Sequence, residues 1–396
     1  MAESTLKTTE PLAHAGVKAW IGYDFLNSLL IINGSIHFSS WITTGQGVNS
    51  FWYGFSFVIS TILLLCGLPW LGACIDKHKN GRQMLLSITV LIVFCAMLLT
   101  GLGHRSEHEI RVVGTLIAFG LINLFYQASL VAYNWLLIQL NGVVTSSDVR
   151  LVSGVGEAAG NAGSVTGAFL GMGLIGLLKM SGDSDPVIDI FLLLAVIYGV
   201  SFLFVDKVIK NNMKLATGGQ SQSSLATSLR EATQILRQPS PIRHFLIAFM
   251  LFADGLLTVQ FYLPIYMTQG LGFSSSQAAA GFALALAAAA IGGWLYSRIG
   301  RQSDTRLFIV CILALWVPTL IALVTYSDIS VIMCILVVAG VLFGLLWSSC
   351  RAYLIELTPP ELLGRVLGFY SIFERAASII GPLLWGGVML PPSRHR

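Results

Sequence analysis

Charged residues are scarce in this sequence. Of its 396 residues, 11% are charged and 55% are hydrophobic, and the mean hydropathy is +0.78, whereas about a quarter of the residues of a soluble domain are charged. This composition excludes an ordinary soluble domain. The net charge of +4 gives no reason to expect a nucleic-acid partner. The chain is predicted to be a membrane protein surrounded by a lipid bilayer.

Motifs of catalysis and of nucleotide binding are also missing. The sequence has no HExxH helix, no GxSxG nucleophile turn and no GxxxxGK[ST] phosphate loop. Its six cysteines form no CxxC pair and its seven histidines do not cluster. We therefore expect neither an enzyme nor a metal or cofactor site. Any solute movement must then draw its energy from an ion or solute gradient.

Apolar runs long enough to cross a membrane fill the chain instead. A hydrocarbon core about 30 Å thick takes roughly 20 helical residues. The 40 glycines are spread through these runs and the alternating pattern of barrel strands is absent, so helices are expected. No cleavable signal pattern precedes the first run, which is therefore predicted to be a membrane helix too. The eleven predicted helices lie at about 19–43, 51–74, 84–103, 112–139, 151–178, 187–205, 243–268, 275–297, 307–326, 330–357 and 366–390.

The positions of basic residues predict the orientation of the chain. Lys and Arg concentrate in the N-terminus and in the loops on the same side, and the opposite loops hold Arg105, Arg111 and Lys179. Because positive residues stay on the cytoplasmic side, the N-terminus and the 206–242 connection are predicted to be cytoplasmic. The short termini favour a bacterial plasma membrane.

The sequence also contains an internal repeat. The stretch "TGGQSQSS" is typical of a flexible linker and divides the chain into two similar parts. Aligning these parts sets Asp24 beside Asp254 and Gly167 beside Gly381. Parallel repeats of six helices are the plan of one large transporter class. The predicted domains are a six-helix half at 1–205, a cytoplasmic linker at 206–242 and a five-helix half at 243–396, with no run for a twelfth helix.

Several stretches carry a family resemblance: "YDFLNS", "AYNWLLIQL", "RLVSGVGEAAGNAGSVTG", "FADGLLT" and "GRVLGFYSIFERAASIIGPLLWG". Over nearly its whole length the chain resembles the major facilitator superfamily. Within it, the chain resembles the vacuole effluxer group, meaning the autophagy-related vacuolar amino-acid exporter and its bacterial relatives. The resemblance implies an all-helical membrane bundle of two pseudo-symmetric halves that transports a small polar solute by alternating access. Amino acids as solute, proton coupling and export are the implied specifics.

A loop motif of that superfamily, G-x-x-x-D-[RK]-x-G-[RK], follows the second predicted helix with two extra residues. The resemblance implies a cytoplasmic gate, because an acid at a helix end can pair with a basic residue in one conformation and lose it in the other. The plainer account is that the basic residues only enforce topology. In the second half Ser297 stands where the acid would be. The implied gate residues are Gly72, Asp76, Lys77, Gly81, Arg82, Arg298 and Arg301.

Glycines recur at four-residue spacing in the fifth predicted helix, at Gly163, Gly167 and Gly171, and Gly381 with Pro382 begins a related pattern in the last. The first pattern resembles the superfamily's antiporter motif. Glycines at this spacing let another helix backbone approach closely. Helix packing therefore explains them without any role in export.

Charged side chains at bilayer depth should face the protein interior or water, because each costs about 2.5 to 3.5 kcal/mol on insertion scales. Asp254 lies roughly ten residues into its predicted helix and so near the midplane. An acid there suits proton coupling. The alternative is a structural hydrogen bond to a facing helix, with Asn27 or Gln260 as partner. Asp24 lies nearer its helix start, where a helix-end role competes with a cavity role.

Other polar residues complete the predicted site. Arg351 suits a carboxylate substrate, although snorkelling or an ion pair with Glu374 or Glu157 is the plainer account. Glu374 and its neighbour Arg375 point about 100° apart on a helix, so they cannot simply satisfy each other. The residues predicted to couple a proton or line a solute cavity are Asp254, Asp24, Asn27, Glu157, Asn161, Arg351 and Glu374.

A second interpretation comes from the odd number of predicted helices. With no run for a twelfth helix, the chain also fits a degenerate or truncated, receptor-like member of the same fold that transports nothing.

Overall fold

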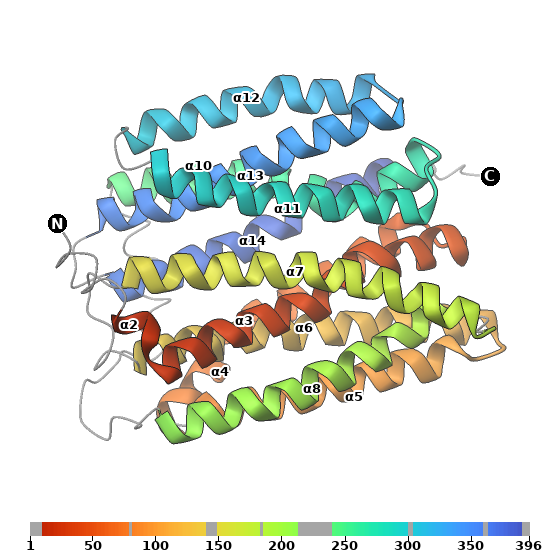
Figure 1. Cartoon of the computed structure of the whole chain (residues 1–396), viewed down its shortest axis with the longest axis horizontal. Helices are drawn as coiled ribbons and strands as arrows, with labels where there is room; N and C mark the ends of the chain where they lie inside the picture. Colours follow the sequence, from red (N-terminus) through yellow and green to blue (C-terminus); the bar gives the residue numbers. More distant parts are fainter. Residues whose placement is uncertain are drawn as a thin grey trace.

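The computed structural model describes residues 10–78, 81–139, 149–182, 185–212, 240–299, 304–358 and 363–389. These residues form long helices that lie side by side, and no strand occurs among them. In Figure 1 the helices α3 to α8 fill the lower part of the bundle, and the helices α10 to α13 fill the upper part.

The helices of the first half run back and forth along one axis (Figure 1). Their bounds are α2 Glu10–Ala13, α3 Ala15–Asn33, the π-helical turns η1 Gly34–Phe38 and η2 Trp41–Gly45, α4 Ser50–His78, α5 Gly81–Gly103, α6 His108–Gln139, α7 Val149–Met180 and α8 Pro186–Asn212. The second half comprises α10 Pro241–Ile265, the π-helical turn η3 Tyr266–Gly270, α11 Ser275–Ile299, α12 Thr305–Thr325, α13 Ile329–Leu357 and α14 Leu363–Met389.

The predicted membrane helices are confirmed. Within the described residues, 9 helices are long and apolar enough to cross a membrane. The helix α3 with its π-helical turns and the helix α14 lie alongside them (Figure 1), which completes the eleven predicted crossings. Most boundaries agree within a few residues.

The helix α8 differs from its prediction, because it continues past 205 to Asn212. Its last turns carry Asp206, whose carboxylate accepts two hydrogen bonds from the Arg82 guanidinium of α5, at 2.7 and 2.6 Å. A bidentate pair of this kind fixes geometry as well as adding energy. The predicted linker at 206–242 therefore begins inside a helix. Its residues 213–239 lie outside the described part of the chain.

Polar caps define where several helices begin. Ser240 accepts a hydrogen bond from the Arg243 backbone at 3.1 Å, and Pro241 occupies the first turn of α10. Asp328 accepts hydrogen bonds from the first backbone N–H groups of α13, at 2.9 and 3.1 Å. Such caps satisfy N–H groups that have no partner within the helix.

Both halves carry a π-helical turn at the same place. The turns η2 and η3 each span 5 residues, and each is closed by a backbone hydrogen bond to its first residue. A glycine at positive φ follows each turn, Gly47 at 69° and Gly272 at 72°. Counted back from these turns, Asp254 corresponds to Leu29. By this count the sequence alignment of Asp24 with Asp254 is out of register by more than one helical turn.

Glycines bring α7 against α3. A Cβ atom at Gly163 would collide with the Phe25 carbonyl group, and one at Gly167 would collide with the Leu29 carbonyl group. A Cβ atom at Gly171 would meet the Asn33 side chain. The helix pair α3 and α7 is in extensive contact. This geometry favours helix packing as the reason for the glycine spacing.

We expect Gly167→Ala to destabilise the protein by about 1–3 kcal/mol, because an added methyl group must push two backbones apart. Gly173 on the same helix is the matched control, since a Cβ atom there meets nothing within 4 Å. Gly173→Ala should be neutral or slightly stabilising, because Ala favours the helix. Thermal unfolding in detergent measures both variants. Equal midpoints for the two would contradict this account of the α3 and α7 contact.

The two halves meet at the end of the bundle that holds η2 and η3, opposite the start of α3 (Figure 1). We call this the distal end. Phe261 of α10 stacks on Tyr53 of α4, with ring centroids 4.6 Å apart. The Trp385 indole of α14 donates a hydrogen bond to Ser50 of α4 at 3.4 Å. These contacts hold the two halves together toward the distal end.

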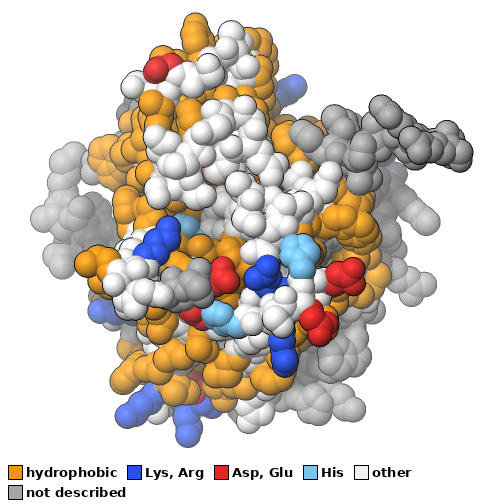
Figure 2. Space-filling model, turned by 90° about the vertical axis from the view of Figure 1, so that its right-hand side faces the viewer, with side chains coloured by type: hydrophobic (Ala, Val, Ile, Leu, Met, Phe, Trp, Pro, Cys, Tyr) orange, Lys and Arg blue, Asp and Glu red, His pale blue; other side chains and the backbone are white. Residues whose placement is uncertain are grey.

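Figure 2 looks onto the distal end. Charged and histidine side chains gather in the lower part of this face, and hydrophobic side chains surround it. His104 follows the end of α5 and Asp189 lies in the first turn of α8, with 2.8 Å between the imidazole Nε2 and the carboxylate. The distribution is that of a helical bundle with a polar end and an apolar belt.

Candidate solute and coupling site

Asp254 lies near the middle of the Pro241–Gly270 segment, which is 30 residues long. Its carboxylate accepts a hydrogen bond from the Gly381 backbone N–H of α14 at 2.8 Å. The side chain is half-buried. Asp254 therefore bonds to a facing helix, which is the arrangement that the sequence left as an alternative, although the partner is neither Asn27 nor Gln260.

A break in α14 supplies that backbone N–H group. Pro382 lies inside the helix, and Ser378 has non-helical angles of φ −89° and ψ 15°. A proline has no N–H to donate to the carbonyl four residues earlier, and its ring pushes that carbonyl away. The break frees N–H groups of the next turn. Asp254 thus acts as a cap, supplied by another helix, for the second segment of α14.

We expect Gly381→Ala to disturb this contact, because a Cβ atom at Gly381 would collide with the Thr258 hydroxyl group. Overpacking of this kind costs about 1–3 kcal/mol. The double variant Thr258→Ala with Gly381→Ala should recover about half of that loss, since it removes the hydroxyl oxygen. Denaturation in detergent gives the three stabilities. A double variant no more stable than Gly381→Ala would show that another contact sets the spacing.

Arg375 links the two halves at bilayer depth. Its guanidinium donates a hydrogen bond to the Gln127 side-chain carbonyl of α6 at 3.2 Å. The Gln127 amide then donates to the Thr61 hydroxyl of α4 at 3.1 Å. Gln127 is 2% exposed, so this chain of bonds is buried. The sequence flagged Arg375 as a membrane charge but placed it outside the site, and its long-range partner Gln127 was missed.

Glu374 points in a different direction from its neighbour Arg375, as expected for adjacent residues on one helix. It accepts a hydrogen bond from the Trp347 indole of α13 at 2.7 Å. Arg351 lies on α13 and is half-buried. Glu374 therefore connects α14 to α13 of the same half. Arg375 connects α14 to α6 of the other half.

Asn27 belongs to a buried network inside the first half. Its amide donates to Ser129 of α6 at 3.2 Å, and it accepts a hydrogen bond from Tyr198 of α8 at 3.3 Å. Tyr23 lies 3.2 Å from Tyr198, hydroxyl to hydroxyl. Asp24 faces α7, because a Cβ atom added at Gly160 would lie 2.9 Å from its carboxylate. These contacts do not bring Asn27 or Asp24 to Asp254.

Other predicted site residues have fewer described contacts. Asn161 lies on α7 and is half-buried, whereas the side chain of Glu157 on the same helix lies outside the described part of the structure. Among the gate residues, Arg82 pairs with Asp206 within the first half, and Gly81 is buried at the start of α5. Four of the others lie in described helices, but at positions whose surroundings are outside the described part of the structure: Gly72, Asp76, Lys77 and Arg298. Arg301 lies outside the described residues.

Among the described residues, no three His, Cys, Asp or Glu side chains lie close enough to hold a metal ion. The side chains of Asp254 and Arg375 themselves offer proton binding, hydrogen bonding and charge pairing.

Comparison with known proteins identifies the family. The family model described as Major Facilitator Superfamily matches residues 138–382, more than half of the chain. The chain belongs to the major facilitator superfamily. It is thus an integral membrane protein of a family of secondary transporters, and the predicted bundle of two helical halves is confirmed.

A bacterial relative is also described as a transporter of this superfamily. The chain is 23% identical over 394 residues to an uncharacterized MFS-type transporter, YxiO, of Bacillus subtilis (strain 168), and the match covers 92% of this chain and 86% of the relative. This relative is a transporter-type protein without a stated solute. The finer resemblance to the vacuole effluxer group stays a prediction.

Solved structures of other major facilitator proteins share the fold. The nucleoside transporter NupG has a TM-score of 0.66 at 15% identity, covering 94% of this chain and 90% of that one. A bacterial homolog of the human lysosomal transporter Spinster, inward-facing and unoccupied, has a TM-score of 0.65 at 13% identity, covering 94% and 81%. The human organic anion transporter MFSD10 has a TM-score of 0.63 at 16% identity, covering 94% and 93%.

Proposed function

We propose that this protein is a proton-coupled secondary transporter of a small polar solute. In this proposal the halves 1–205 and 243–396 rock about a midplane site, and the N-terminus and the 206–242 connection face the cytoplasm of a bacterial cell. The observation that carries the proposal is the place of Asp254, a membrane acid bonded to the break in a helix of its own half. Binding or loss of a proton there would change the contact between α10 and α14.

Arg375 supports a polar solute. The Arg375 guanidinium of α14 reaches α6 of the other half. A charged group at bilayer depth is expected to face the protein interior or a water-filled cavity. Such a group also suits the carboxylate of a solute, because guanidinium pairs well with carboxylates. We therefore propose amino acids as the first solute class and export as the direction, following the resemblance in the sequence. Nucleosides and organic anions come next, from the names of the structural relatives.

The test uses purified protein in liposomes that contain a pH-sensitive dye. Pools of amino acids, nucleosides, organic anions and sugars are added in turn, beside protein-free liposomes. Solute-dependent proton movement in one pool supports the proposal and starts to identify the solute. Silence in every pool, from protein shown to be folded and inserted, would instead support a receptor-like member that transports nothing.

A further inference from the structure

A histidine lies buried in a π-helical turn where the two halves meet. His37 belongs to η1, and it is 7% exposed. The turn η1 packs on α10 and α11 of the second half. Its Ile36 shares one apolar cluster with Ala168 of α7 and with Ala279 and Phe282 of α11. Turns of this kind inside α-helices are frequent at functional sites, and this one carries a titratable side chain into the contact between the halves.

Two buried polar atoms at this turn have no hydrogen-bond partner. They are His37 Nε2 and Asn33 Oδ1, and Asn33 is 0% exposed. The orientation of the Asn33 amide follows from its bonds, because its nitrogen donates to two carbonyl groups, that of Leu29 at 2.9 Å and that of Gly167 at 3.2 Å. The Asn33 oxygen is therefore an acceptor without a donor, one helical turn before His37.

Gly171 of α7 lies beside both of these atoms. A Cβ atom at Gly171 would overlap Asn33 Oδ1 and would lie 3.0 Å from His37 Nε2. The two atoms therefore lie against the same short piece of α7 backbone, and no water molecule fits between them and that backbone. The Ala168 backbone, one turn earlier on α7, faces the imidazole as well.

The helices α7 and α11 bring no carboxylate to His37. The sequence of α7 has no titratable side chain between Glu157 and Lys179, and that of α11 has none before Tyr296. Two carboxylates at the start of α8 have partners of their own: Asp185 with Trp41, and Asp189 with His104. Other titratable groups on elements that pack against η1 toward this end are Tyr53, Tyr262, Tyr266 and Arg111.

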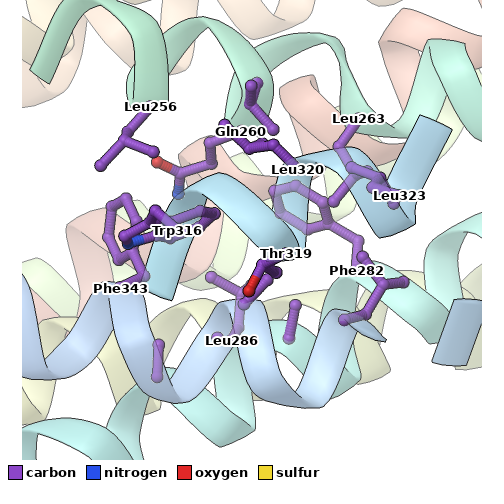
Figure 3. Close-up of a pocket in the computed structure, with 16 residues that line it drawn as sticks. Leu256, Gln260, Leu263, Phe282, Leu286, Trp316, Thr319, Leu320, Leu323 and Phe343 are labelled. Atoms are coloured by element: carbon purple, nitrogen blue, oxygen red, sulfur yellow. The ribbon is translucent and has the colours of Figure 1, made fainter. Parts of the chain in front are cut away.

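The second half presents apolar side chains to this turn. Phe282 and Leu286 of α11 belong to the same cluster as Ile36. Figure 3 shows both of them lining a small cavity together with Leu263 of α10 and Leu323 of α12, which are members of that cluster too. A charge on His37 would therefore meet apolar surface on the side of the second half.

Protonation of His37 would place a charge in this apolar contact. An imidazolium donates from both ring nitrogens, so the Asn33 oxygen could accept one of its hydrogen bonds. One such bond does not replace the hydration that a buried charge loses. Water that enters when the halves part at the distal end would hydrate both the charge and the Asn33 oxygen.

We propose that His37 and Asn33 form a proton-binding site, separate from Asp254, whose occupation opens the distal end of the transporter. The neutral imidazole favours the closed contact, and the charged imidazolium favours an open and hydrated distal end. The charge of an ordinary histidine changes between about pH 5 and pH 8, so acid raises the share of molecules that are open at this end. The inference does not rest on proton coupling at Asp254, because it concerns the equilibrium between two conformations and requires no solute flux.

Thiol labelling of Ala279→Cys measures the open share. Ala279 is 1% exposed in the cluster that contains Ile36, so a cysteine there reacts when the distal end opens. Ser276→Cys, at an exposed position in the first turn of the same helix, gives the reactivity of an uncovered cysteine at each pH. The purified full chain in liposomes is treated with N-ethylmaleimide, and mass spectrometry gives the labelling rate at each introduced cysteine.

We expect the rate at Ala279→Cys, divided by the rate at Ser276→Cys, to rise about 10- to 30-fold from about pH 7.5 to about pH 5.0. This is the change for an ordinary histidine that carries its proton almost only in the open conformation. A ratio that stays constant over this range in a chain with His37 intact would overturn the proposal.

Two histidine variants, each combined with both cysteines in turn, identify the group that responds. His37→Gln keeps a polar side chain that cannot become charged, and it should hold the ratio constant. His104→Gln is the matched control, because His104 is a second histidine at this end and lies 2.8 Å from Asp189; it should keep the full pH response. A response that survives in His37→Gln, or one that is lost in His104→Gln, would overturn the assignment to His37.

Discussion

Asp254→Asn should abolish solute-driven proton movement, with a fall of at least about 100-fold, while the protein stays folded. The reason lies in the hydrogen bond from the Gly381 backbone, which a carboxylate oxygen now accepts. An asparagine carbonyl oxygen of the same size can accept the same bond. The substitution therefore preserves the cap on the broken helix α14 and removes only the ability to gain and lose a proton.

Two measurements separate coupling from structure in this variant. Proton flux is followed with the pH-sensitive dye, and exchange of labelled solute across the same liposomes is followed without a pH gradient. A coupling role predicts that exchange continues within a few-fold of the original protein while proton flux is lost. Asp328→Asn is the matched control, because Asp328 caps α13 and asparagine caps equally well. Intact proton flux in Asp254→Asn would exclude the coupling role.

Arg375→Met should reduce solute transport about 100-fold and leave the stability of the protein nearly unchanged. Removing a cation at bilayer depth removes an insertion cost of about 2.5–3.5 kcal/mol. It also forfeits the charged hydrogen bond to Gln127, worth about 1.5–3 kcal/mol. These two terms nearly cancel. A purely structural residue would lower stability and transport together, whereas Arg375 should lower transport alone.

Initial rates of solute exchange and thermal unfolding midpoints check this expectation. Lys179→Met is the control, since Lys179 is an exposed cation in the last turn of α7. Gln127→Met should reproduce part of the transport loss if the bond between α14 and α6 is the working contact. Full transport in Arg375→Met would show that the cation only fastens the two halves.

The sequence allowed the membrane helices and the close glycine contacts to be predicted because both depend on local information. Hydropathy over roughly 20 residues defines a crossing helix. Four-residue glycine spacing defines a flat helix face, and Gly163 and Gly167 do lie against the α3 backbone. Charged residues at bilayer depth are also visible in a sequence, and Asp254 and Arg375 were both recognised that way.

The partners of those residues could not be predicted, because they come from helices far apart in the chain. Pro382 is visible in the sequence, but only the fold shows that Asp254 caps the break next to it. A local motif singled out Arg82, but its partner Asp206 lies 124 residues away and was not predicted. Hydropathy likewise does not fix the register of a weak repeat, and the π-helical turns η2 and η3 indicate a different register from the sequence alignment.

The aromatic contacts between the two halves make the distal end of the molecule costly to open. Phe261 lies between two rings of α4, Tyr53 at 4.6 Å and Phe57 at 4.8 Å between centroids. Exposing the interior toward the distal end requires both ring pairs to separate, at a cost of about 1–3 kcal/mol for two aromatic pairs. Without solute, the resting population should therefore keep the distal side shut. In the proposed transport cycle, solute binding or proton binding would supply this energy.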